Sequence, residues 1–210
     1  MDLEFAINFL SNMMYIGVRD RKKNETLSIS RTMNGAQFCE ILNWIEDALE
    51  MQEIDFRKDI KYWTLGIGPD SFSPLRITAA LFAGLTFQKK KYFVRALPSL
   101  TAVFDSISEK KSNPAVLFDG RRNEIFCFSS PDQRTPKIVK KASEIDEFDY
   151  VCAMSYHQEV IQSFFQDRSS SITFFEDFPI IELIENNKEY TAIEKVDYFY
   201  EDLIYLRPPV

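Results

Sequence analysis

A strand, a turn and a helix follow one another over residues 65–87, and this stretch constrains the fold more than any other. The apolar residues before the turn indicate a buried strand, and Gly68 with Pro69 indicates a tight turn. Ser73 fits the N-cap of the helix, and Pro74 fits its first position, where the missing N–H has no cost. Units of this kind are where α/β proteins bind phosphates. The first question is therefore whether this one does.

The elements around this stretch follow a recognisable order. Those of the first half are predicted to be strands at 3–10, 13–19 and 25–31, a helix after residue 35, a strand at 62–67, a helix from Pro74, a strand at 92–97 and a helix from residue 98. Three antiparallel strands that lead into a parallel strand–helix–strand section are typical of the half-repeat of the ribonuclease H-like, actin-type fold.

A similar order of elements restarts after residue 112. Its elements are predicted to be strands at 114–119, 124–128 and 149–154, a helix at 158–166, an extended segment at 171–175 and a helix at 179–187. We therefore predict an α/β protein with two actin-like lobes, residues 1–106 and 107–210, each a mixed sheet flanked by helices. The second lobe is predicted to be smaller and more irregular, with the last residues returning to the first lobe.

Charge and cysteine content limit the partners and the compartment. The net charge of −7 argues against broad binding of nucleic acid or anionic membrane by this chain alone. Three widely spaced cysteines without a CxxC pair favour a reducing compartment. The start of the chain is charged and does not resemble a signal peptide, and no apolar run reaches the roughly 20 residues of a membrane helix. We expect a cytoplasmic protein.

The chain has a single histidine, His157, and this removes much enzymatic chemistry. Zinc would need cysteines or carboxylates for nearly all of its ligands, and these are not clustered in the sequence. Any Ser-His-Asp or Cys-His arrangement would have to use His157, and no nucleophile motif lies near it. We interpret His157 as a surface or partly buried residue and predict no catalytic residues, no metal and no cofactor.

Four segments of the chain together carry a family pattern. Residues 66–76 read GIGPDSFSPLR, residues 119–126 read DGRRNEIF, residues 204–207 read IYLR, and residues 97–100 read LPSL. The first three resemble the motifs GxGPGSFTGLR, DARRGEVY and PxYLR of the TsaB (YeaZ) family of bacterial tRNA-modification partner proteins. The fourth stands at the place of that family's VSSLE segment and adds a weaker match. The order and spacing of the segments cover nearly the whole chain.

The resemblance implies a two-lobed, actin-like protein without catalysis of its own. Such a protein binds a related catalytic subunit, TsaD, and supports transfer of a threonylcarbamoyl group to an adenosine of tRNA, so that it meets tRNA only indirectly. An ATP-hydrolysing third protein completes the machinery. Pairing uses the two helices of the N-terminal lobe, packed against those of TsaD or of a second copy.

This sequence departs from the family pattern where nucleotide would be handled. Asn8 stands where the first strand usually has Asp, and an amide lacks the negative charge that a Mg²⁺ site favours. Phe9 and Leu10 replace small polar residues beside it. Asp70 and Pro74 replace glycines, and the Asp70 carboxylate would repel a phosphate. We therefore interpret the turn as structural. Its residues are Gly66, Gly68, Pro69, Asp70, Ser73 and Pro74.

Small residues line the helix after the turn in i, i+4 pairs, Ala79 with Ala83 and Ala80 with Gly84. Such pairs let another helix approach closely, inside the fold or from a partner. The residues alone favour internal packing, whereas the resemblance favours a partner. Arg76 opposes the helix dipole and is either held by a carboxylate or solvated. The predicted partner-binding residues are Arg76, Ala79, Ala80, Ala83, Gly84 and Phe87.

The sequence thus predicts a non-catalytic accessory subunit for threonylcarbamoyladenosine modification of tRNA that forms a heterodimer through its N-lobe helices. One alternative is a diverged homodimeric scaffold that no longer serves tRNA modification. The other is an active actin-like ATPase or kinase, which requires nucleotide binding.

Overall fold

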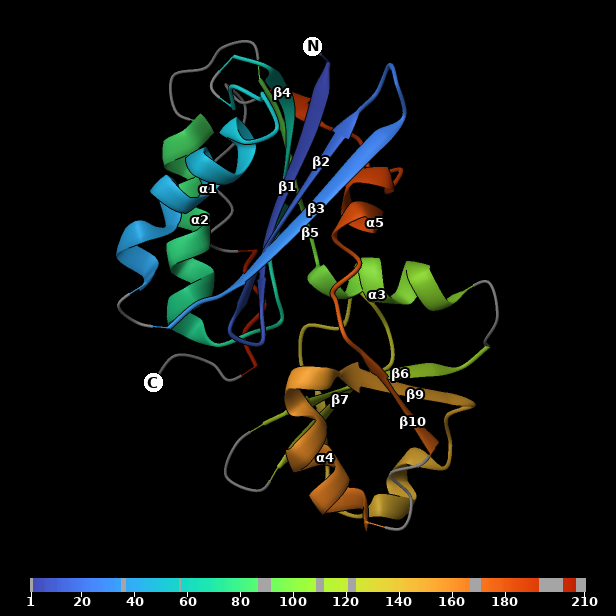
Figure 1. Ribbon diagram of the computed structural model, residues 1–210. Helices are drawn as coiled ribbons and strands as arrows, with labels where there is room; N and C mark the ends of the chain where they lie inside the picture. Colours follow the sequence, from blue (N-terminus) through green and yellow to red (C-terminus); the bar gives the residue numbers. More distant parts are fainter. Residues whose placement is uncertain are drawn as a thin grey trace.

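Two β-sheets, each flanked by helices, make up the computed structural model in Figure 1. The described residues are 2–34, 37–56, 58–86, 92–108, 112–120, 124–166, 171–192 and 202–206. Phe87, the Arg121–Asn123 turn and Arg207, which entered the sequence predictions, lie outside these residues. No helix within the described ranges is long and apolar enough to span a bilayer.

The first sheet has the strand order β11-β5-β4-β1-β2-β3. Its strands are β1 (Leu3–Leu10), β2 (Met13–Asp20), β3 (Glu25–Thr32), β4 (Ile60–Gly66), β5 (Phe93–Leu97) and β11 (Thr191–Ala192). β1, β4 and β5 are parallel, and β2, β3 and β11 each run antiparallel to their neighbours. Every residue of β1 is buried, because helices cover both faces of the sheet at its centre.

The second sheet repeats the topology of the first. Its strands are β6 (Pro114–Asp119), β7 (Ile125–Phe128), β8 (Lys137–Val139), β9 (Tyr150–Met154) and β10 (Ile172–Phe175). The order β8-β7-β6-β9-β10 corresponds to β3-β2-β1-β4-β5, with the same antiparallel meander and the same three parallel strands. The predicted α/β class with two mixed, actin-like sheets is therefore confirmed.

The two sheets separate the buried side chains into clusters on their opposite faces. α1 (Ile41–Glu50), preceded by a 3₁₀ turn at Gln37–Glu40, and α2 (Phe72–Thr86) cover one face of the first sheet and share one core cluster with it. α3 (Ser99–Ser108) and α5 (Ile180–Glu185) cover the opposite face. α4 (Gln158–Phe165) follows a 3₁₀ turn at Ser155–His157 and packs on the second sheet. Another 3₁₀ turn, Ala142–Ile145, lies between β8 and β9.

The chain returns to the first lobe after the second sheet is complete. α5 packs on β1 and β2, β11 pairs with the edge strand β5, and residues 203–206 lie against the turn between β4 and α2. The strands of the second sheet span only residues 114–175 of the 107–210 expected for that lobe. α5 was expected as a helix from sequence, but neither β8 nor β11 was.

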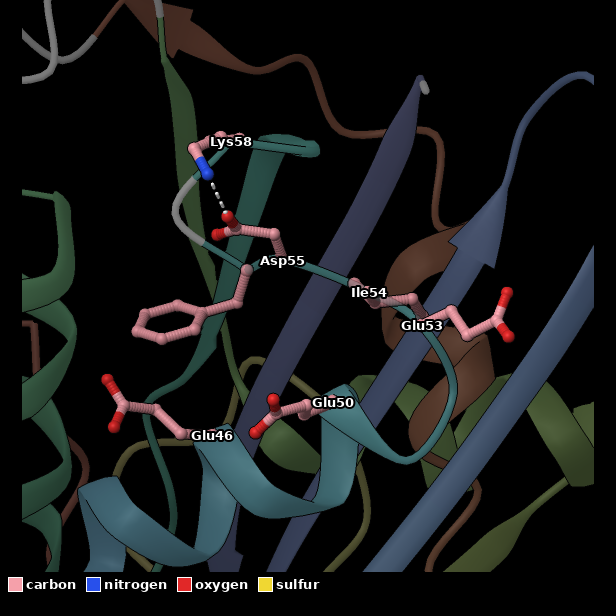
Figure 2. Close-up of a pocket in the computed structure, with 7 residues that line it drawn as sticks. Glu46, Glu50, Glu53, Ile54, Asp55 and Lys58 are labelled. Atoms are coloured by element: carbon pink, nitrogen blue, oxygen red, sulfur yellow. Dashed lines mark ion pairs between the residues drawn. The ribbon is translucent and has the colours of Figure 1, made fainter.

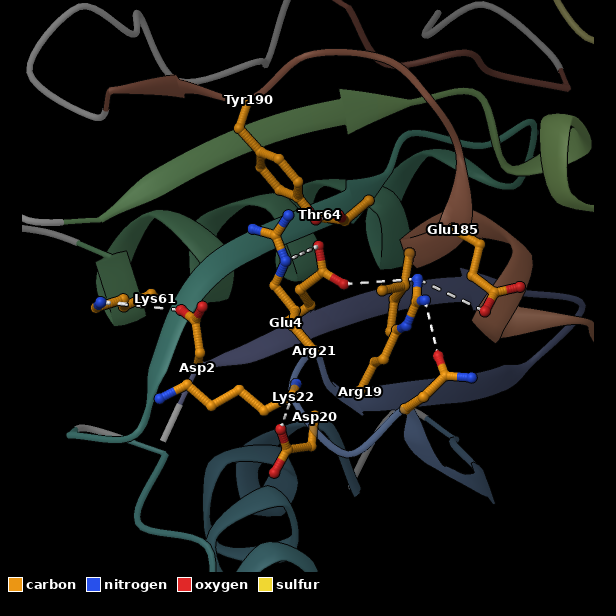
Figure 3. A network of polar contacts seen from close by, with 12 residues as sticks. Asp2, Glu4, Arg19, Asp20, Arg21, Lys22, Lys61, Thr64, Glu185 and Tyr190 are labelled. Carbon is orange, nitrogen blue, oxygen red and sulfur yellow. Dashed lines mark hydrogen bonds and ion pairs between the residues drawn. The ribbon is translucent and has the colours of Figure 1, made fainter.

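A charged network fixes α5 at the side of the sheet. Arg19 Nη1 lies 3.9 Å from Glu4 Oε2 and 3.6 Å from Glu185 Oε1 at the end of α5, and Figure 3 shows the guanidinium between the two carboxylates. Arg21 Nε is 3.9 Å from the other oxygen of Glu4. Burial raises the pKa of Glu4, and the two arginines oppose this rise. Arg19 therefore links the sheet to α5 through a shared pair of carboxylates.

Candidate functional site

The turn between β4 and α2 is a tight elbow that depends on glycine. Gly68 has a φ of 95°, and a Cβ there would lie 2.4 Å from the carbonyl oxygen of Ile204. The Gly68–Pro69 peptide bond is cis. At Gly66 a Cβ would lie 2.1 Å from Asn8 Oδ1. Other chain segments therefore approach the elbow backbone too closely for side chains at Gly66 and Gly68.

Two of the other segments that carry the family resemblance meet at this elbow. Ile204 N donates to the carbonyl of Ile67 at 2.7 Å, and Leu206 N donates to the carbonyl of Asp70 at 2.9 Å. From the second segment, Ser99 N donates to the carbonyl of Gly68 at 2.7 Å. Segments far apart in the sequence therefore form one hydrogen-bonded junction.

Asn8 occupies the centre of this junction and is fully buried. Its Oδ1 accepts a 2.6 Å hydrogen bond from Ser99 Oγ, and Ser99 Oγ accepts one from Gly68 N at 3.1 Å. The amide Nδ2 of Asn8 has no hydrogen-bond partner among the described residues. Within the described residues, no three or more His, Cys, Asp or Glu side chains form a group that could hold a metal ion. Asn8 therefore acts in the packing of the elbow, through its oxygen.

Asp70 is also buried, and its carboxylate accepts backbone hydrogen bonds. Oδ2 accepts from Ser11 N at 2.5 Å, and Oδ1 accepts from the adjacent Ser71 N. The start of α2 corrects the predicted cap: the Ser71 carbonyl accepts from Leu75 N, so Ser71 is the N-cap and Ser73 is already helical. Pro74 is the third helical residue, where its missing N–H still has no cost, because the N–H groups of the first turn lack partners within the helix.

The space between the lobes is filled by apolar side chains. One buried cluster joins the first sheet, α3, α5 and the second sheet. Its largest members from the two sides include Leu10, Tyr15, Leu97, Phe118, Phe126, Phe128, Met154 and Phe178. The Tyr15 and Phe178 rings lie 5.3 Å apart within this cluster. Burial raises the pKa of the Tyr15 hydroxyl, with Asp177 and Asp70 adding to the rise.

His157 is buried, with 7% of its surface exposed, which corrects its interpretation as a surface or partly buried residue. Its Nε2 lies 2.7 Å from Ser11 Oγ, and its ring contacts Phe118 with 5.7 Å between centroids. Next to it, Asn12 donates a hydrogen bond to the hydroxyl of Tyr156. The turn between β1 and β2 therefore contacts the second lobe through both of its residues.

The outer face of α2 is open along part of its length. Ala80 and Gly84 are exposed, and a Cβ at Gly84 would meet no atom within 4 Å among the residues that the structure describes. Ala83 is half-buried, whereas Ala79 is 4% exposed and belongs to the core, so its predicted contact with a partner is wrong. Arg76 is exposed, and its guanidinium lies 5.0 Å from the centre of the Phe72 ring. That stacking accounts for a cation in the first turns of the helix.

Gly84→Ala should stabilise the isolated chain by about 0.5–1 kcal/mol, because alanine has the better helix propensity and its methyl group enters open space. The urea midpoint of unfolding should rise with no change in slope. A lower midpoint would show that something covers Gly84 in the free chain.

An acidic groove of about 650 Å³ lies at the end of α1. Figure 2 shows Glu46 and Glu50 on α1, with Glu53, Asp55 and Lys58 on the loop that follows. Lys58 Nζ lies 2.6 Å from Asp55 Oδ2, and the lining of the groove comprises four carboxylates and this one lysine. These side chains give the end of α1 a net negative charge.

The duplicated sheet topology and the elbow at the carboxyl end of β4 define a two-lobed actin-like protein. Among solved structures, the chain is similar to an uncharacterized protein with similarity to peptidase YEAZ from Pseudomonas aeruginosa, with a TM-score of 0.64 and 15% identity over 99% of this chain and 100% of that one. It is also similar to YeaZ from Pseudomonas aeruginosa, with a TM-score of 0.57 and 15% identity over 88% and 90%. No protein-family model matches the sequence, and neither does any curated protein.

Proposed function

We propose that this chain is a non-catalytic accessory subunit of the TsaB type, which binds a TsaD-type catalytic subunit in threonylcarbamoyladenosine modification of tRNA. The observation that carries the proposal is the uncovered surface of α2 around Ala80 and Gly84, in a fold similar to that of YeaZ. A glycine inside a helix costs about 1 kcal/mol relative to alanine. Because a Cβ at Gly84 would meet no atom of the described residues within 4 Å, a close contact from another helix is a physical reason for a glycine here.

The chemistry of the elbow supports an accessory role over the ATPase alternative. Asn8 supplies no charge for a magnesium ion, and the Asp70 carboxylate lies against the start of α2, where a phosphate would be repelled. Apolar side chains fill the region between the lobes. A calorimetric titration with Mg-ATP should therefore show no binding by the isolated chain. Tight binding would favour the ATPase.

The exposed apolar residue Ile77 extends the proposed contact surface along α2. Its side chain is 37% exposed and lies one turn before Ala80. The α2 surface, defined here as Arg76, Ile77, Ala80, Ala83 and Gly84, combines small residues at its centre with a longer apolar side chain and a cation at one end. Small central residues allow two helix backbones to approach closely, as a helix-to-helix contact requires.

Ala80→Glu tests this surface. The position is exposed in the free chain, so the fold should tolerate the change, whereas a carboxylate in a close helix contact would be desolvated without a partner charge. Co-purification of the TsaD-type subunit with the tagged full-length chain should fall by at least about tenfold, the effect of 1.4 kcal/mol in binding. Val160→Glu, at an exposed apolar position on α4 in the other lobe, is the matched control and should bind normally.

The same experiment separates the proposal from the homodimeric scaffold. Undiminished binding by Ala80→Glu would show that the α2 surface is not the interface. If the wild-type chain recovers only second copies of itself, and its depletion leaves threonylcarbamoyladenosine in tRNA unchanged, the scaffold is the correct function.

A further inference from the structure

The turn between β1 and β2 is held from both lobes at once. Ser11 and Asn12, which form it, have φ values of 55° and 64°, which non-glycine residues seldom adopt. From the first lobe, Asp70 Oδ2 accepts the Ser11 backbone N–H. From the second lobe, His157 and Tyr156 contact the Ser11 and Asn12 side chains. Ser11 itself is only 6% exposed. Two left-handed residues are therefore held by contacts with three residues, one from the first lobe and two from the second.

The donors around Asp70 are of the kind that bind anions. Two of these donors are backbone N–H groups, one from the β1–β2 turn and one at the N-cap of α2, where the helix dipole is positive. The side chain that fills this position is itself an anion and is 5% exposed. Charge-assisted hydrogen bonds of a carboxylate to backbone N–H groups are stronger than neutral ones.

We propose that the Asp70 carboxylate is an internal anion that fills an anion-binding site between the β1–β2 turn and the start of α2, and that it thereby holds the turn against the second lobe. The site is occupied by the protein's own side chain, so the wild-type chain has no vacancy there for an external anion. The contact acts as a latch between the lobes: with the Ser11 N–H held by Asp70, Ser11 Oγ is directed to His157 Nε2.

The pairing of Ser11 with His157 also resembles the nucleophile and base of a hydrolase, but the surroundings oppose that chemistry. An acyl-transfer reaction needs free N–H groups beside the serine to stabilise an oxyanion. Here the Ser11 N–H is already bound to a carboxylate, and that negative charge would destabilise an oxyanion at the same place. Labelling of Ser11 by a fluorophosphonate probe would overturn the latch assignment.

Asp70→Ala should open the anion site, and inorganic phosphate is the probe. The thermal midpoint of the variant in sodium chloride should be lower than that of wild type by about 4 °C or more. Sodium phosphate at matched ionic strength should restore at least half of this loss, while wild type shows no phosphate-specific increase. Asp47→Ala, an exposed position on α1, changes the net charge equally and should behave as wild type. A variant with an unchanged midpoint, or with no response to phosphate, would refute the proposal.

If the alanine variant does not fold, Asp70→Asn tests the role of the Asp70 carboxylate instead, because asparagine keeps the size of the side chain and removes its charge. In the wild type, hydrogen exchange of the Ser11 amide should be strongly protected, and in Asp70→Asn it should be at least about tenfold faster. The ring nitrogen signals of His157, the single histidine, should shift in the same variant as its contact with Ser11 loosens. Equal exchange in the two chains, or unchanged His157 signals, would contradict the latch.

Discussion

Replacement of Arg95 by leucine should destabilise the chain by about 4 kcal/mol or more, one of the two largest single effects that we expect. Arg95 lies in the middle of β5, is 4% exposed, and uses all five of its N–H donors. Its Nε donates to Thr64 Oγ1, and its two terminal nitrogens donate to four backbone carbonyls at distances of 2.6 to 2.8 Å. The carbonyls belong to Leu183, Ile184, Asn186 and Lys188.

These carbonyls explain why no apolar residue can substitute for Arg95. Those of Leu183 and Ile184 belong to the last turn of α5, where carbonyls have no partner within the helix. A buried ion pair can be exchanged for a pair of apolar side chains, but backbone carbonyls cannot be removed by mutation. Burial lowers the pKa of Arg95, and stacking on Tyr190, with 4.1 Å from the guanidinium carbon to the ring centre, offsets part of the cost of burying the charge.

Urea unfolding of Arg95→Leu, Arg95→Lys and Arg31→Ala tests this assignment. Lysine keeps the charge but carries three donors on one nitrogen. The free energy of unfolding of Arg95→Lys should therefore remain more than about 2 kcal/mol below that of wild type. Arg31 is a half-exposed residue of β3, and its Nη2 lies 3.9 Å from Glu40 Oε2. Arg31→Ala should therefore lower the free energy of unfolding by less than about 0.5 kcal/mol. A loss below about 1 kcal/mol for Arg95→Leu would mean that the hydrogen bonds of Arg95 contribute little to holding α5.

The helices and strands were predictable where the hydrophobic pattern alone determines their type and their bounds. β1 was expected at 3–10 and lies at Leu3–Leu10, and α5 was expected at 179–187 and lies at Ile180–Glu185. The placement of α5 on the first sheet was not predictable, because it depends on Arg95, far away in the sequence. A signal was present: an arginine inside the apolar strand FVRAL must find buried partners.

The candidate site was predictable in its backbone but not in its side-chain contacts. The turn residues were identified from glycine and proline, whose local geometry is strongly restricted. The contact of Asp70 with Ser11, and of Ser11 with His157, joins residues whose spacing carries no periodic signal. On α2, small residues lie on more than one side, so the pattern alone could not tell that Ala79 is in the core.

Gly66→Ala should cost about 3 kcal/mol or more, because the new methyl group would overlap a buried amide. The added Cβ would lie 2.1 Å from Asn8 Oδ1 and 2.7 Å from its Cγ. Asn8 cannot easily move away, since it is fully buried and bound to Ser99 Oγ at 2.6 Å. Gly66 is not among the residues with positive φ, so the expected cost is steric and does not arise from backbone strain.

A double-mutant cycle with Asn8→Ala isolates this overlap. Alone, Asn8→Ala should cost about 1–2 kcal/mol through the lost hydrogen bond to Ser99. In that background Gly66→Ala should cost less than about 1 kcal/mol, because the amide that it would strike is gone, which gives a coupling free energy of about 2 kcal/mol or more. Gly84→Ala in the same urea series is the control for a glycine with open space beside it. If the losses at Gly66 and Asn8 are additive, then Asn8 does not fix the glycine at the end of β4, and another feature of the elbow excludes the side chain.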